Sequence, residues 1–149
     1  ASLLVVFNGL RLLRRWDYAS QLKAAFKTEL DKGKELLASG AYEQAFYHLE
    51  RAHILGQRNY LTHVISHYWM LRAGLKTGDI QEVFGQVIRI VGSAGSLIGK
   101  VPLGNSGRAN VSPVKPMPIP EDLKQYFEWY CIYSSWWQRM VKMCVSVAF

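Results

Sequence analysis

The stretch from Gly40 to His67 reads GAYEQAFYHLERAHILGQRNYLTHVISH, and it decides the fold predicted for this chain. Apolar side chains recur every three or four residues on both sides of the turn Gly56-Gln-Arg-Asn59, which is the spacing of two amphipathic helices. A turn this short places the two helices side by side and antiparallel. The stretch therefore predicts a helical hairpin, and all four histidines of the chain lie in it.

A related pattern returns further along the chain. A shift of 38 residues places Ser39-Gly40 on Thr77-Gly78 and Ala45-Phe46 on Val83-Phe84. The order of glycine, small and large apolar residues resembles the second helix of a tetratricopeptide repeat, although the period is longer than the usual ~34 residues. We expect an all-α fold with two stacked tetratricopeptide-like helical hairpins over residues 20–91, beginning with a helix over 20–38.

The remaining segments complete a single helical domain of residues 1–149. Residues 1–19 form an N-terminal helical extension, in which residues 3–16 have a basic outer face; docking on the core is favoured over contact with a membrane surface. Residues 92–120 form a Gly/Pro strap, because prolines disfavour helix in the residues before them. Residues 121–149 form an aromatic C-terminal helix, which covers the open end of the hairpins or forms a homodimer.

Composition narrows the class of protein. The formal charge is +7, but the basic residues are spread along the chain, which argues against nucleic-acid binding. No apolar run approaches the ~20 residues of a transmembrane span. The two cysteines, Cys131 and Cys144, lie about 20 Å apart if they share one helix, too far for a disulfide. These features predict a cytoplasmic protein.

The four histidines are arranged symmetrically about the turn. His53 and His63 lie at one height in the predicted hairpin, and His48 and His67 lie at another. His63 and His67 share one helix face, which Met70 continues. His48 and His53 diverge by about 140° around their helix, so His48 is the weakest candidate for a common site.

These residues suggest a metal site. Glu50-x-x-His53 is the carboxylate–imidazole pair with which helical bundles hold iron or manganese. With His63 and His67 it supplies ligands for zinc, iron or copper, and Met70 would favour copper. In the alternative interpretation, the histidines hydrogen-bond one another, a tyrosine such as Tyr42 or Tyr68, or a carbonyl, and bind no metal.

Several short runs resemble a known family. They include HLERAHILGQ at 48–57, His63-x-x-x-His67, Gly104-Asn105-x-Gly107, Asn110-Val-Ser112 and Pro116-Met-Pro-Ile-Pro120. Over about residues 22–123 the chain resembles a small bacterial family catalogued as domain of unknown function 3703. The resemblance implies no activity, but it marks the histidine hairpin and the Gly-Asn and Pro-rich runs as the family's characteristic residues.

Two hypotheses for function follow. The first is a non-enzymatic binding or interaction module, whose His-lined groove between helices takes a protein, a peptide or a second subunit. The second is a metal-binding protein, with or without catalysis, that holds a divalent ion through His53, His63, His67 and Glu50. The sequence assigns no catalytic residue and no other cofactor, and it leans away from an enzyme. Further candidate groove residues are His48, Met70, Tyr42, Asn105 and Asn110.

Overall fold

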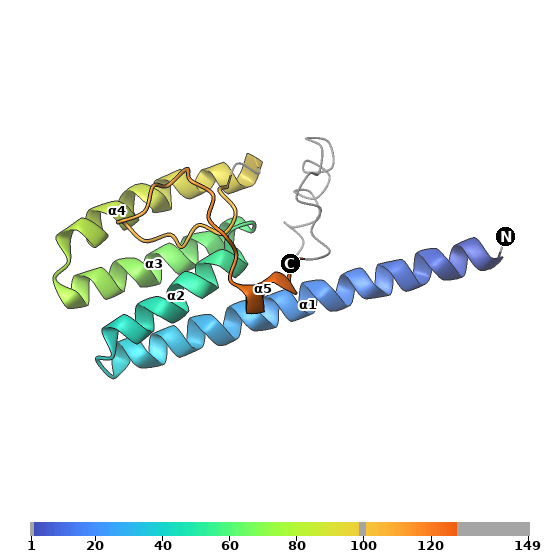
Figure 1. Ribbon diagram of the computed structural model, residues 1–149, viewed down its shortest axis with the longest axis horizontal. Helices are drawn as coiled ribbons and strands as arrows, with labels where there is room; N and C mark the ends of the chain where they lie inside the picture. The colour runs from blue at the N-terminus through green and yellow to red at the C-terminus, as the bar shows by residue number, and fades with distance from the viewer. Residues whose placement is uncertain (1, 99–100, 128–149) are drawn as a thin grey trace.

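The computed structural model describes residues 2–98 and 101–127, with side chains from Tyr18 onward except that of Ile98. This part of the chain is helical and contains no strand, which confirms the all-α class (Figure 1). The elements in chain order are α1 (Ser2–Ala38), α2 (Tyr42–Gly56), α3 (Tyr60–Thr77), α4 (Ile80–Gly92), the 3-10 helix η1 (Ser93–Ile98) and α5 (Glu121–Lys124).

The first four helices form a row in which each packs mainly on the next along the chain (Figure 1). Helices α2 and α3 are the hairpin predicted from the histidine stretch, and α1 and α4 lie at the two ends of the row. Helix α1 extends well past its neighbours toward the N-terminus. The tetratricopeptide style of stacking stays a prediction.

The helix boundaries differ from the prediction at two places. Residues 2–38 form one continuous helix rather than two, because Asp17-Tyr-Ala-Ser20 contains no proline or glycine that would end it. The 3-10 helix η1 occupies residues 93–98, where only an irregular strap was expected. Helix α5 begins at Glu121, but the aromatic helix predicted through residue 149 lies outside the described residues beyond Phe127.

Both ends of α3 are capped. The Asn59 side chain accepts a hydrogen bond from the Thr62 amide at 3.2 Å and so caps the first turn. Gly78 ends the helix in the left-handed conformation, at φ 70°, where a glycine is strongly preferred. Asp79 then caps α4 by accepting from the Glu82 amide at 2.9 Å. These turns fix the order and direction of the helices that carry the histidines.

The interior changes character along the row of helices. Where α1 meets α2 it is apolar, and the buried side chains there include Phe26, Leu30, Leu37, Ala45, Phe46 and Leu49. Among α2, α3 and α4 the buried side chains are largely polar, namely His53, His63, Ser66, His67, Glu82 and Gln86. Polar groups are costly to bury unless they are hydrogen-bonded, so the stability of this second region depends on the partners of these side chains.

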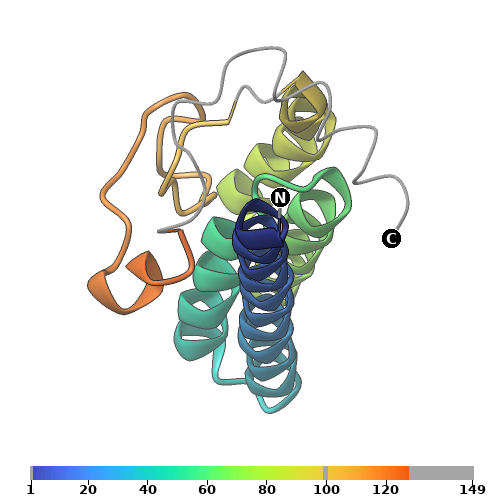
Figure 2. The ribbon, with the colours of Figure 1, turned by 90° about the vertical axis from the view of Figure 1, so that its right-hand side faces the viewer.

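Residues 101–120 contain no helix and lie along α2 and α4 (Figure 2), which they contact through His53 and Gln86. Asn105 organises this loop, because its side-chain amide donates to the carbonyls of Ser112 and Lys115 at 2.8 Å each. The Met117 amide donates to the Leu103 carbonyl at 3.0 Å and closes the loop on itself. The loop therefore has a defined shape against the polar part of the interior.

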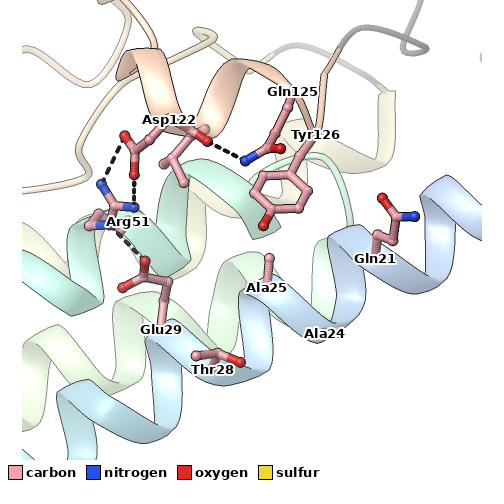
Figure 3. Close-up of a pocket in the computed structure, with 10 residues that line it drawn as sticks. Gln21, Ala24, Ala25, Thr28, Glu29, Arg51, Asp122, Gln125 and Tyr126 are labelled. Carbon is pink, nitrogen blue, oxygen red and sulfur yellow. Dashed lines mark hydrogen bonds and ion pairs between the residues drawn. The ribbon is translucent and has the colours of Figure 1, made fainter.

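Helix α5 returns the chain to α1 and α2. Arg51 of α2 donates to Glu29 of α1 at 2.7 Å and also pairs with Asp122 (Figure 3). The hollow beside these residues has a volume of about 520 Å³, and Gln21, Ala25 and Tyr126 contribute to its wall. Among the described helices, none has both the length and the apolar character needed to cross a membrane.

Candidate metal centre

Three histidines converge between α2 and α3. The ring centroids of His53, His63 and His67 are 4.6–4.9 Å apart. Each ring offers one nitrogen, and these three nitrogens lie within 4.8 Å of one another. All three side chains are buried. The structure thus brings together three of the four residues that the sequence predicted as metal ligands.

A backbone carbonyl determines the tautomer of His53. The Nδ1 atom lies 2.9 Å from the carbonyl oxygen of Asn105, which can only accept, so Nδ1 carries the hydrogen and donates. The Nε2 atom of the neutral ring then holds a free lone pair. It is buried and has no hydrogen-bond partner in the described part of the chain.

Gln86 of α4 determines the tautomer of His67. The side-chain nitrogen of Gln86 donates to Glu82 Oε1 at 2.6 Å and to the Gly107 carbonyl at 2.8 Å, so its oxygen faces His67. His67 Nδ1 lies 2.7 Å from that oxygen and donates to it. As in His53, the lone pair is left on Nε2.

His63 completes the set from the same face of α3. Its Nε2 lies 3.1 Å from His67 Nε2, and without a metal it donates to that lone pair. Its Nδ1 is buried without a partner among the described residues. Two imidazole nitrogens bound at 2.0–2.1 Å to a tetrahedral ion are about 3.3 Å apart, so this pair already has the separation of a metal site, while the full set of three lies within 4.8 Å.

Burial keeps these imidazoles neutral. It lowers the pKa of His63 to about 4. It also lowers the pKa of His67 to about 3, with the nearby His63 as a further cause. The pKa of His53 is held well below its usual value, first by burial and then by the two other histidines. Metal ligation requires neutral imidazole, which is the form the fold favours.

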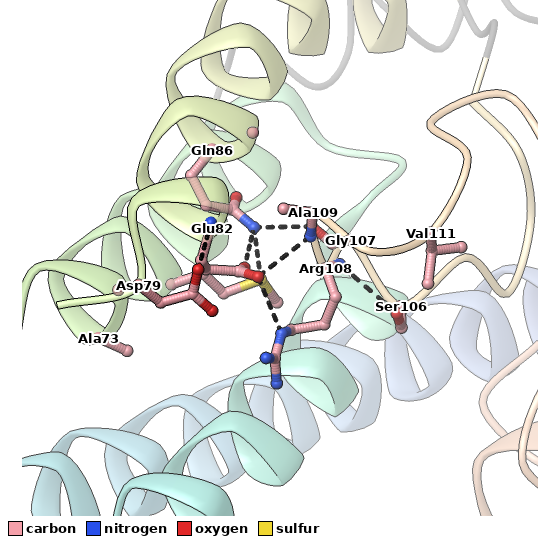
Figure 4. A network of polar contacts seen from close by, with 12 residues as sticks. Ala73, Asp79, Glu82, Gln86, Ser106, Gly107, Arg108, Ala109 and Val111 are labelled. Carbon is pink, nitrogen blue, oxygen red and sulfur yellow. Dashed lines mark hydrogen bonds and ion pairs between the residues drawn. The ribbon is translucent and has the colours of Figure 1, made fainter. Parts of the chain in front are cut away.

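The polar contacts continue beyond Gln86, the partner of His67, to Glu82 and Arg108 (Figure 4). The carboxylate of Glu82 is fully buried; beyond its bond with Gln86 it accepts from Arg108 Nε at 3.1 Å and from the Ala109 amide at 3.2 Å. The Arg108 guanidinium lies 3.7 Å from the centre of the Phe46 ring. The Arg108 cation therefore balances the buried charge of Glu82 and ties the loop to α4.

Glu50, the fourth predicted ligand, is not in the cluster. Its side chain is partly exposed and accepts from Arg108 Nη1 at 3.4 Å. Partial burial raises its pKa, and Arg108 acts in the opposite direction. Residue 50 lies three positions before His53, a spacing that directs both side chains to one side of α2 without bringing them to one point. In the structure Arg108 joins Glu50 to the edge of the Glu82 network instead.

The other candidate residues have separate positions. His48 faces α1, where its Nδ1 pairs with Glu29 at 2.7 Å. Met70 is buried, and its sulfur accepts from the Gln86 amide at 3.5 Å. Tyr42 packs against the apolar core, and Asn110 is exposed. Asn105 belongs to the site through its carbonyl and through the loop that its side chain organises.

Glu82, Gln86 and Arg108 were not predicted as site residues. Glu82 and Gln86 are one turn apart and form the inward face of α4. A signal was present in the sequence: the strongest apolar stripe of α4 excludes both residues, and it lies on the opposite face of the helix. An amphipathic helix is normally read with its apolar face inward, and here that reading gives the wrong orientation.

Gln57 adds one more unpartnered group. It follows His53 by four positions at the end of α2 and is fully buried. Neither its amide oxygen nor its nitrogen has a hydrogen-bond partner in the described residues. A buried amide without a hydrogen-bond partner is costly, so Gln57 is a source of instability in this part of the interior.

The fold and the cluster define a small all-helical protein with three buried imidazoles covered by a glycine- and asparagine-containing loop. The chain belongs to the family described as protein of unknown function (DUF3703), whose match covers residues 20–127. The matched region includes every residue of the histidine cluster, the covering loop and α5. No curated protein and no solved structure matches the chain.

Proposed function

We propose that the protein binds one transition-metal ion through the Nε2 atoms of His53, His63 and His67. The observation that carries this proposal is the pair of oxygen acceptors on the far nitrogens of His53 and His67. In metalloproteins a ligating histidine commonly donates its other ring hydrogen to a carbonyl or carboxylate, which orients the ring and makes it a better ligand. The Asn105 carbonyl and Gln86 do this for two of the three rings.

The donor set favours zinc as the ion to test first. Neutral imidazoles bind zinc, copper, nickel and iron. Three histidines with a fourth position free for a small ligand form a recurrent tetrahedral zinc arrangement. Glu82 lies beyond Gln86 and accepts from its amide, so it holds the group that supports His67 without occupying a ligand position.

The burial of the three histidines favours the metal site over an open groove that binds a peptide. The first hypothesis placed them in a groove between helices that takes a peptide or a partner helix. His53, His63 and His67 are instead buried beneath residues 101–120, and Gly107 of this loop packs directly on the His53 ring. A site closed in this way suits a small ion that is retained and not a chain that docks and leaves.

Metal content of protein purified without an affinity tag tests the proposal. We expect one zinc or cobalt ion per chain after reconstitution, with a visible cobalt spectrum typical of tetrahedral coordination. His53→Gln and His67→Gln should each lose the ion. His48→Gln is the matched control and should keep it, because His48 faces Glu29. Wild-type protein that takes up no metal, or His67→Gln protein that binds it as well as wild type, would refute the proposal.

A further inference from the structure

Helix α4 presents an apolar face to solvent. Five large apolar side chains along its length are exposed: Ile80, Phe84, Val87, Ile88 and Val91. They recur at intervals of three and four residues, so they form one stripe that runs the whole helix, about 20 Å at 1.5 Å per residue. Contiguous apolar surface of this kind usually marks an interaction site.

The apolar stripe faces outward because polar residues occupy the inward face of α4. Glu82 and Gln86 are the buried residues of this helix, and they hold the polar network behind His67. One helix cannot turn both faces to the same interior. The apolar stripe is therefore left without a partner in the described residues of its own chain.

We propose that the outward face of α4 is a homodimer interface, in which α4 of a second copy packs against it in the antiparallel direction. This inference is independent of the metal site. The net charge of +7 opposes contact between two copies, so an interface is favoured where the surface carries no charge. The exposed positions of α4 carry no charged residue, and charged residues are depleted at the centres of protein interfaces.

The spacing of the stripe suits a two-fold interface. In such an interface the same patch occurs on both subunits, so each residue must find a match on reversal of direction. An antiparallel copy centred near Gln86 places Phe84 opposite Ile88, and Ile80 opposite Val91. Each half of the stripe thus meets the other half, with apolar contacts at both ends.

The position of the C-terminal end favours a second copy over the chain's own remaining residues. The described part of the chain ends at Phe127, which is buried in the core shared by α1 and α2. The neighbouring Tyr126 lines the hollow with Gln21 and Ala25 of α1 (Figure 3). Helices α1 and α4 are at opposite ends of the row, so the described part of the chain ends beside α1 rather than beside α4.

Sedimentation velocity of the full chain, from low to high micromolar concentration, tests the proposal. We expect the mass to rise toward twice the chain mass of 17.0 kDa. Ile88→Glu and Val91→Glu should remain monomeric at concentrations where the wild type is dimeric. Val114→Glu is the matched control and should dimerise as the wild type does, because Val114 is 78% exposed and Val91 is 75% exposed.

Three outcomes would overturn the proposal: a wild-type monomer at every concentration, a dimer that survives Ile88→Glu, or a monomer that binds anionic lipid vesicles through this face. A second measurement needs no substitution. Hydrogen exchange of residues 80–92 should slow as the wild-type chain associates, and a doubled mass with unchanged exchange there would place the interface elsewhere. Circular dichroism of each variant verifies that its helices are intact.

Discussion

Replacement of Gly107 by alanine tests the close contact between the loop of residues 101–120 and the His53 ring. Gly107 has φ 82°, and a Cβ atom at this position would lie 2.8 Å from Cγ of the His53 ring. A left-handed alanine costs roughly 1–2 kcal/mol. Overpacking a well-filled interior adds roughly 1–3 kcal/mol. We therefore expect Gly107→Ala to lower the free energy of unfolding by about 2–5 kcal/mol.

Gly40→Ala is the control that isolates the contact with His53. Gly40 has φ 84°, almost the same as Gly107, but a Cβ atom there would meet nothing within 4 Å. Only the cost of the left-handed conformation should appear, roughly 1–2 kcal/mol. The measurement is urea unfolding of the metal-free protein, followed by zinc titration of each variant under native conditions.

Zinc affinity is the second measurement that compares Gly107→Ala with Gly40→Ala. Displacement of the His53 ring disturbs both its bond to Asn105 and the direction of its free nitrogen, so zinc should bind Gly107→Ala about 10–100-fold more weakly. Gly40→Ala should bind zinc as the wild type does. Equal destabilisation of the two variants, with equal zinc affinity, would contradict the close contact between Gly107 and the His53 ring.

Three further predictions concern the same centre. In the metal-free protein, stability should be greatest above about pH 6.5 and should fall toward pH 4, because the unfolded chain binds protons on His63 and His67 that the folded chain excludes. Each such histidine contributes about 1.4 kcal/mol per pH unit in this window, and flat unfolding free energies between pH 6.5 and 4 would contradict it. Gln86→Leu should weaken zinc binding about 10–100-fold, since it removes the acceptor on His67 Nδ1, whereas Gln81→Leu on the exposed side of α4 should not; equal affinities would remove the role assigned to Gln86. Gln57→Leu, which is similar in size, should be neutral or stabilising in the metal-free protein because it removes a buried amide without partners, and a loss of several kcal/mol would show that the amide has partners after all.

Helix α4 would serve both the metal site and the dimer, each through a different face. Its inner face supports His67 through Gln86 and Glu82, and its outer face offers an uncharged apolar stripe to a second copy. Dimerisation and metal binding would then share a helix without sharing residues. Loss of the dimer in Ile88→Glu with full metal content would demonstrate this separation directly.

Much of the site could be predicted from the spacing of a few residues. His63 and His67 are four apart, and His53 lies at equal distance from the turn, so helix geometry alone predicts that they meet. The same geometry turned His48 away, and the structure places it against Glu29. Glu50 was included because the i, i+3 pair is a known ligand pattern, but the position of Arg108 depends on the loop and was not available from local spacing.

By itself the sequence determined the helices, the hairpin and the meeting of three histidines, because these follow from periodicity, short turns and contacts between neighbours along the chain. It did not determine the orientation of α4, since an apolar stripe predicts an inward face and the buried network required the reverse. The sequence also did not identify the groups that orient the imidazole rings of His53 and His67. The Asn105 carbonyl lies 52 residues from His53, and Gln86 lies 19 residues from His67. Contacts at such separations arise only when the tertiary structure brings the loop and α4 over the hairpin.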